Sequence, residues 1–404
     1  MKILILGAGI GGTTLALALQ RAGLDFVILE QAKAFAEIGA GVQLSSNAVK
    51  VLSRLGLEDQ LSKVCCEPDS HKFKDWSTGE TILRTPLCPE VRDVFGAPYF
   101  HSHRPDLLDA LTADLDENRI RFGFKVESVG EDYDGPWVRS VDGEIVRGDV
   151  LIGADGIHSV VRDQIFQPHV PLRSGYCTWR GVIDAADVAD LNVPISSYIV
   201  MGPKLSFVFY YVSGGSKINW LAMGPTESTM RESWSQTAQK EGLLTSFKNW
   251  YEVPVRFIEA TQQPFVTALY DRDPLETWVR GNIAVMGDAA HAMLPYHAQG
   301  AGQSIEDAWV LARLLEKNDD GPTLALKRFE GLRKNRADRM IQHSRDAERW
   351  YHLDAAEDVE RRNSRFRRYN DEASFTPQQT WLYSYDAEKA VEGTDDEWRA
   401  LSAW

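Results

Sequence analysis

Cysteines are scarce in this chain, and their spacing fits neither a metal site nor a disulfide framework. The 404 residues include only four of them, namely Cys65, Cys66, Cys88 and Cys177. None of them forms a Cys-x-x-Cys pair, so the sequence predicts no metal centre. A few unpatterned thiols in a long chain are typical of a reducing compartment. We therefore expect reduced cysteines in a cytoplasmic protein.

Long apolar runs are also missing. No window approaches the run of about 18 apolar residues that would predict a membrane span. The first apolar run, residues 3–6, is followed at once by glycines. That context predicts a strand rather than the core of a signal peptide.

The chain has no excess of positive charge. Its net charge of −14 argues against nucleic acid as a partner, but it does not exclude a small anionic substrate at a locally basic site. Apolar residues make up 44% and charged residues 25% of the chain, which are values typical of globular proteins. The length allows two domains.

The first informative feature that is present is a glycine motif between a predicted strand and a predicted helix. Residues 2–6 have the apolar character of a central parallel strand, residues 13–22 have helical spacing, and residues 26–29 form a second strand. Gly7 would allow the tight turn, Gly9 the approach of a pyrophosphate, and Gly12 the packing of helix on sheet. This unit predicts a dinucleotide site, NAD or FAD, with contacts from Gly7, Gly9, Ile10, Gly11, Gly12 and the ribose-binding acid Glu30.

Two later motifs also follow predicted strands. Gly153-Ala154-Asp155-Gly156 comes directly after residues 150–152, and Gly287-Asp288-Ala289-Ala290-His291 comes after residues 283–286. The carboxylate of Asp288 would lie at the carboxyl edge of a parallel sheet, where ligands of this architecture bind. The loop 295–302 then leads into a helix predicted to begin at Ser304. The positive end of that helix would face the ligand.

Together these motifs resemble those of the class A flavin monooxygenases, the single-component aromatic hydroxylases related to para-hydroxybenzoate hydroxylase. The resemblance rests on the first glycine motif, on Asp155-Gly156 with Ser159 and Arg162, and on Gly287-Asp288 with the loop at Pro295, and it covers roughly residues 1–345. Residues 293–295, 300–303, 306–308 and 381–386 are most similar to the salicylate hydroxylase subgroup.

The resemblance implies an α/β fold, in which a Rossmann-type FAD-binding domain is interrupted by a β-sheet substrate domain and followed by a helical C-terminal region. We expect the following division of the chain: FAD-binding domain 1–70, substrate-domain hairpin 71–100, FAD-binding domain 101–168, β-rich substrate domain 169–270, FAD-binding domain 271–345, and helical C-terminal region 346–404.

The resemblance also implies the cofactors. These are FAD held without a covalent bond, NADH or NADPH as a transient reductant, and dioxygen as co-substrate, with a flavin C4a-hydroperoxide as the hydroxylating species. By resemblance, Asp155 and Gly156 serve both FAD and the nicotinamide donor. Further FAD contacts are implied at Glu30, Gln43, Arg104, Val126, Asp288, Pro295, Gly300, Ala301 and Gly302.

Candidates for the catalytic groups are few. A phenol is activated when a nearby base removes its proton, and the pocket around it should be dry. His297 lies in the loop expected beneath the flavin ring, where it would contact the substrate or transfer its proton, and a purely structural histidine is the alternative. Tyr210 and Tyr211 lie on one predicted strand with opposite facing, so one of them should point into the pocket and core packing is the alternative for either. No dedicated carboxylate clamp is visible in the sequence.

The resemblance favours a small aromatic acid as substrate, with salicylate first and decarboxylative hydroxylation to catechol as the reaction. Hydroxylation of 3-hydroxybenzoate at carbon 6 or of 6-hydroxynicotinate at carbon 3 is the alternative within the family. A flavin dehydrogenase or oxidase without oxygen insertion, or a flavin-binding regulator, would be a different class. Either a monomer or a homodimer is compatible with the sequence.

Five arginines recur near one face of a predicted C-terminal helix: Arg333, Arg336, Arg339, Arg345 and Arg349. Such a pattern usually marks a solvated face with acidic neighbours. We expect that arrangement here rather than an anion-binding site.

Overall fold

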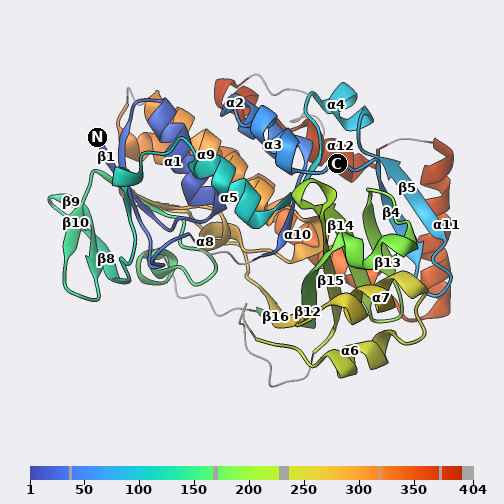
Figure 1. Ribbon diagram of the computed structural model, residues 1–404. Coiled ribbons are helices and arrows are strands. Elements are labelled where there is room, and N and C mark those ends of the chain that lie inside the picture. Colours follow the sequence, from blue (N-terminus) through green and yellow to red (C-terminus); the bar gives the residue numbers. More distant parts are fainter. Residues whose placement is uncertain (36–38, 167–171, 227–235, 318–319, 373–374, 394–404) are drawn as a thin grey trace.

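The computed structural model describes residues 1–35, 39–166, 172–226, 236–317, 320–372 and 375–393. One six-stranded sheet is built from three separate parts of the chain (Figure 1). Across the sheet, the strands are β17 (Val279–Arg280), β18 (Ile283–Val285), β11 (Val150–Gly153), β1 (Lys2–Leu6), β2 (Asp25–Leu29) and β7 (Ile120–Arg121). β1 is parallel to β2 and β11, and β11 is parallel to β18. Residues 3–6 are at most 1% exposed, which explains their unbroken apolar run.

Helices cover this sheet and connect its parts. The elements are α1 (Ile10–Arg21), α2 (Ser46–Arg54), α3 (Glu58–Val64), α4 (Glu90–Phe95), α5 (Arg104–Thr112), α8 (Asp288–His291) and α9 (Gly300–Glu316). α1 packs against both α5 and α9, and α2 also packs against α9. α9 is therefore the helix around which the cofactor-binding part of the molecule is assembled.

A second, seven-stranded sheet lies beside the first one (Figure 1). Its strands in order are β16 (Phe265–Asp271), β12 (Leu172–Asp184), β15 (Lys217–Pro225), β14 (Ser206–Val212), β13 (Ser197–Met201), β4 (Ser70–Asp75) and β5 (Thr81–Pro86). One face packs on α6 (Lys240–Phe247) and α7 (Glu252–Ala260) through an aromatic cluster that includes Phe207, Phe209 and Trp220. The alternate residues of β14, such as Val208, point to the opposite face.

Two small sheets complete the β structure. Residues 126–147 form a three-stranded antiparallel sheet of β8 (Val126–Asp132), β9 (Gly135–Ser140) and β10 (Ile145–Arg147). β3 (Gly41–Leu44) pairs with β6 (Phe100–His103). Gly41 of β3 also contacts the second sheet, because its N–H donates to the side-chain oxygen of Asn219 in β15 at 2.8 Å.

The C-terminal part is helical, with α10 (Pro322–Tyr351), α11 (Ala356–Glu372), α12 (Pro377–Ser384) and α13 (Ala387–Glu392). α10 packs on α9, and α11 packs on β5 at the far edge of the second sheet. The boundary that the sequence placed between residues 345 and 346 falls inside α10, which continues without a break. Within the described ranges, no helix is long and apolar enough to cross a membrane. The predicted fold class is confirmed.

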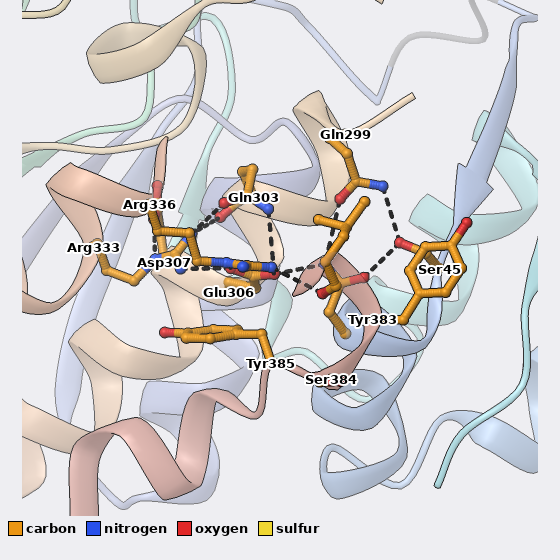
Figure 2. A network of polar contacts seen from close by, with 12 residues as sticks. Ser45, Gln299, Gln303, Glu306, Asp307, Arg333, Arg336, Tyr383, Ser384 and Tyr385 are labelled. Atoms are coloured by element: carbon orange, nitrogen blue, oxygen red, sulfur yellow. Dashed lines mark hydrogen bonds and ion pairs between the residues drawn. The ribbon is translucent and has the colours of Figure 1, made fainter. Parts of the chain in front are cut away.

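The arginine face of α10 differs from the prediction. Arg333 and Arg336 are at most 1% exposed and lie against two equally buried carboxylates of α9, Glu306 and Asp307 (Figure 2). Arg333 pairs with Glu306 at 2.5 Å and with Asp307 at 2.7 Å. Arg336 pairs with Glu306 at 2.8 Å. For these two arginines, the expectation of a solvated face was wrong.

The same network reaches other elements. Asn47 of α2 donates to Glu306 at 2.6 Å, and Arg336 donates to the carbonyl oxygen of Leu382 in α12 at 3.1 Å. The guanidinium of Arg336 also lies 4.1 Å from the ring centre of Tyr385. A periodic run of arginines looks the same in sequence whether it faces water or buried carboxylates, because the carboxylates come from another helix.

Removing one partner of a buried ion pair leaves an uncompensated charge. We therefore expect Arg333→Gln to lower the free energy of unfolding by about 3–5 kcal/mol, as measured by urea titration. The matched control is Arg328→Gln on the same helix, which breaks the exposed pair with Asp320 and should cost less than about 1 kcal/mol. Equal losses in the two variants would contradict this account of the network.

Candidate active site

In the turn formed by the glycine motif, a side chain would clash at the first and last glycine but not at the middle one. Gly7 has φ +98°, and a Cβ there would lie 2.4 Å from the carbonyl oxygen of Ala154. A Cβ on Gly12 would lie 2.1 Å from the carbonyl oxygen of Gly7, whereas a Cβ on Gly9 would meet no heavy atom within 4 Å. The backbone at the start of α1 is therefore accessible at Gly9, where a pyrophosphate can approach its N–H groups.

The three sequence motifs meet at one place. The contact between Gly7 and Ala154 joins the first motif to the second. A Cβ on Gly11 would lie 3.2 Å from the Cβ of Ser304, and a Cβ on Gly287 would lie 2.8 Å from the Ser304 hydroxyl oxygen. Because these glycines carry no side chains, the segments that follow β1, β11 and β18 can approach one another closely at the carboxyl edge of the sheet.

Glu30 follows β2 and lies beside the first motif. One carboxylate oxygen accepts from the N–H of Ala8 and the other from the N–H of Ala32, both at 2.7 Å. These bonds hold the carboxylate at the edge of the turn, and each oxygen keeps a further lone pair. The location suits the predicted ribose contact.

Asp155 is bound within its own loop. Its carboxylate accepts from the hydroxyl of Ser159 at 2.6 Å and from the N–H of Val160 at 2.7 Å. Gly156 has φ +74° and leaves open space where a Cβ would be. The carboxylate therefore shapes the turn, and direct contact of Asp155 and Gly156 with FAD or the nicotinamide donor stays a prediction.

The third motif lies at the start of α9. This helix begins at Gly300 rather than at the predicted Ser304, so Gly300, Ala301 and Gly302 form its first turn. The side chain of Asp288 is exposed at the same point, with its Oδ1 atom 3.7 Å from the Cβ position of Gly300. The positive end of α9 and this carboxylate thus face the same space.

Next to this turn, His291 is fixed by a hydrogen bond. Its Nε2 lies 2.6 Å from Asp307, which also accepts from the N–H of Gly287 at 3.0 Å. The His291 and Gly287 contacts join the third motif to the buried arginine network.

Other predicted cofactor residues lie around the same space. Gln43 in β3 is 7% exposed, and its oxygen accepts from the hydroxyl of Tyr99 at 2.6 Å. Arg104 is the first residue of α5 and is half-buried. Val126 begins β8 and packs partly buried against the main core. Direct contacts of these three residues with FAD stay predictions. A dinucleotide nevertheless fits the site, because the N-termini of α1 and α9 are accessible at Gly9 and Gly300 and Glu30 lies between the sheet and the glycine turn.

A cavity of about 810 Å³ opens next to this space. It is bounded by the Pro295–His297 turn, by the inner face of the second sheet and by α11 and α12. Its polar lining includes Gln43, His71, Thr85, Tyr99, Ser197, His297, Gln378, Gln379 and Tyr383. Its apolar lining includes Phe73, Leu83, Ile199, Val208, Met223, Pro295, Trp350, Phe366 and Leu382. A hollow lined by both aromatic and aliphatic side chains and by polar groups that can orient a ligand is typical of a small-molecule site.

His297 lies on the wall of this cavity. Its Nε2 is 3.0 Å from the side-chain nitrogen of Gln378 and 3.2 Å from the carbonyl oxygen of His343. Burial, and then the neighbouring His343, lower the pKa of His297 to about 4. The imidazole is therefore neutral at neutral pH.

The two predicted tyrosines point in opposite directions. The ring of Tyr210 lies 4.6 Å from that of His101 and belongs to the face of β14 that turns towards Gln43, and burial raises its pKa. Tyr211 turns to the other face, where its hydroxyl donates to the carbonyl oxygen of Val193 at 2.9 Å. Of the two, only Tyr210 lies on the cavity side of the sheet.

Comparisons with known proteins agree with this geometry. A family model described as "FAD binding domain" matches residues 1–344. The chain is 32% identical over 387 residues to 3-amino-4-hydroxybenzoate 2-monooxygenase from Streptomyces cremeus, with 96% of each chain covered. The chain belongs to the class A FAD-binding aromatic hydroxylase family. It is an FAD-dependent aromatic monooxygenase.

Two further relatives extend the comparison. 6-Hydroxynicotinate 3-monooxygenase from Bordetella bronchiseptica is 33% identical over 358 residues, which cover 85% of this hydroxylase and 91% of the relative. A solved salicylate hydroxylase substrate complex has a TM-score of 0.81 and 26% identity, with 97% of each chain covered. The flavin cofactor and the aromatic hydroxylase family are thus established, and the particular ring is not.

Several cavity residues of this hydroxylase escaped the sequence analysis. His71 is 9% exposed, and its pKa is lowered to about 4 by burial and then by His297. Its Nε2 lies 3.4 Å from the hydroxyl of Tyr383, and its ring meets the edge of Tyr99 at 5.3 Å. His71 comes from the β4–β5 hairpin, which carries no motif. Tyr383 comes from α12, and its signal was the similarity of residues 381–386 to salicylate hydroxylases.

The close approach of Gly12 to Gly7 gives a test of the cofactor turn. Gly12→Ala would force the turn open, and overpacking of this kind costs about 1–3 kcal/mol. We expect FAD to bind about 5- to 150-fold more weakly, as measured by titrating the apoprotein and following flavin fluorescence. The control is Gly331→Ala in α10, where a Cβ meets no heavy atom within 4 Å. If both variants bind FAD like the parent protein, Gly12 does not support the site.

Proposed function

We propose that this monooxygenase hydroxylates a small phenolic acid, with NADH or NADPH as the electron donor and dioxygen as co-substrate. The observation that carries the proposal is the position of the cavity. One side of the cavity is the turn at Pro295–His297, which lies next to the positive end of α9. The other side is an aromatic wall that fits a flat ring. FAD, when bound, would take electrons from the nicotinamide and activate dioxygen.

The side chains of this chain would perform three tasks. Apolar groups such as Phe73, Ile199 and Met223 exclude water from the ring, which protects a reactive oxygen species from loss. Tyr99, Ser197 and Gln43 offer hydrogen bonds that orient polar substituents. Neutral His297 would accept the phenolic proton and so increase electron density on the ring carbon that is attacked.

Two substrates are supported by different observations. Salicylate is supported by the motifs at residues 293–295 and 381–386 and by the structural similarity to a salicylate hydroxylase. 3-Amino-4-hydroxybenzoate is supported by the relative that matches nearly the whole chain. Decarboxylative hydroxylation of salicylate would release carbon dioxide, whereas hydroxylation of the second acid at carbon 2 would keep its carboxylate.

The proposal is tested by a substrate screen of the purified holoenzyme. Salicylate, 3-hydroxybenzoate, 6-hydroxynicotinate and 3-amino-4-hydroxybenzoate are each incubated with NADH or NADPH in air. We expect one acid to stimulate nicotinamide oxidation and to give a stoichiometric hydroxylated product, identified by mass spectrometry together with a carbon dioxide measurement. Hydrogen peroxide in place of any hydroxylated product with every acid would favour an oxidase and contradict the proposal.

The role of His297 is tested by His297→Ala. Loss of a general base typically costs about 10²- to 10⁴-fold in rate, so we expect hydroxylation to fall within this range while FAD binding is retained. His352→Ala is the matched control, because His352 is also a buried histidine with a pKa lowered to about 4 but does not line the cavity. If hydroxylation rate and coupling are unchanged in His297→Ala, His297 has no role in the reaction.

A further inference from the structure

One helix of the cavity carries unusual charge. Arg361, Arg362 and Arg365 of α11 all line the cavity, and Asp358 is the carboxylate among the described lining residues. Arg361 is exposed and pairs with Glu357 at 3.1 Å and with Asp358 at 3.3 Å. The wall formed by α11 is therefore locally cationic, although the whole chain carries a net charge of −14.

Arg362 is the buried member of this group. It is 9% exposed, and its guanidinium donates to the carbonyl oxygen of Trp350 at 3.0 Å and to the side-chain oxygen of Asn363 at 3.0 and 3.1 Å. These three bonds use three of the five N–H groups of a guanidinium. Two N–H groups therefore remain for a further acceptor.

What this arginine lacks is a carboxylate in direct contact with its guanidinium. Among the residues that the structure describes, no carboxylate lies within 4.0 Å of its guanidinium, whereas buried Arg333 and Arg336 both contact α9 carboxylates. Burial lowers the pKa of Arg362 to about 10, and the more distant carboxylate of Asp75 partly opposes this shift, so the group is still a cation at neutral pH. A buried cation without a paired anion is costly, and an anionic ligand in the cavity would remove that cost.

We propose that Arg362 binds the carboxylate of the aromatic acid substrate and so makes this hydroxylase selective for acids over their neutral analogues. A guanidinium with free N–H groups on two nitrogens can bind a carboxylate in a two-point contact. Arg361 and Arg365, at the more exposed part of the same wall, would favour the approach of the anion. This inference rests on the function proposed above.

The test compares each acid of the screen with its carboxamide, which has nearly the same shape but no charge. Dissociation constants are measured on the FAD-loaded protein from the change in the flavin absorption spectrum. We expect the parent protein to bind its acid about 10- to 100-fold more tightly than the amide. In Arg362→Gln this ratio should fall to about 1, because the acid weakens and the amide does not.

Arg367→Gln is the matched control, because Arg367 lies on the same helix and is exposed, pairs with Glu360, and is not part of the cavity lining. It should keep the ratio of the parent protein. Arg362→Lys keeps the charge but not the two-point geometry, and should give an intermediate ratio. It also supplies the measurement if Arg362→Gln does not fold.

Four outcomes would overturn the inference. They are equal binding of acid and amide by the parent protein, no binding of any acid, an equal loss of acid and amide in Arg362→Gln, and an unchanged acid-to-amide ratio with a raised KM for NADH. The third would mean a structural role, and the last would assign Arg362 to the phosphates of the reductant. Failure of the proposed function is recognised separately from failure of this inference. If the proposed function is wrong, the parent enzyme gives no hydroxylated product from any of the acids, independently of the Arg362 variants.

Discussion

Two fully buried carboxylates at the start of α9, Glu306 and Asp307, face two fully buried arginines of α10 (Figure 2). Such charges are stable inside a protein only when they are paired and hydrogen-bonded, so the network permits one arrangement of the helices that supply it. Through Gly287 and His291, the network also fixes the turn that carries Asp288. Cofactor turn, α9 and α10 are thus held as one unit.

The cavity depends on the same unit. Arg336 and Asn47 connect the network to α12 and α2, and α12 contributes Gln378 and Tyr383 to the cavity wall. The other walls come from the second sheet and from α11, so segments that are hundreds of residues apart meet around one hollow. The cofactor turn and the cavity walls are therefore built by different parts of the chain on a common support.

Burial has opposite consequences for the ionisable groups of this molecule. In the α9–α10 network, each buried charge has a partner, which keeps it ionised and makes it structural. In the cavity, His71 and His297 are neutral because burial lowers their pKa to about 4. Arg362 stays charged although no carboxylate contacts its guanidinium directly.

The sequence by itself determined the cofactor half. Gly7, Gly12 and Gly287 are required by backbone contacts within a few ångströms, and such local constraints leave a readable pattern at fixed spacing. It also located β1, β2, β11 and β18 of the first sheet, because buried parallel strands are continuously apolar. Only the tertiary structure decided that Arg333 and Arg336 are buried, that Tyr211 faces away from the cavity, and that His71, Tyr383 and Arg362 line it. These roles depend on partners from distant segments, and a substrate pocket built from such pairings leaves no motif along the chain.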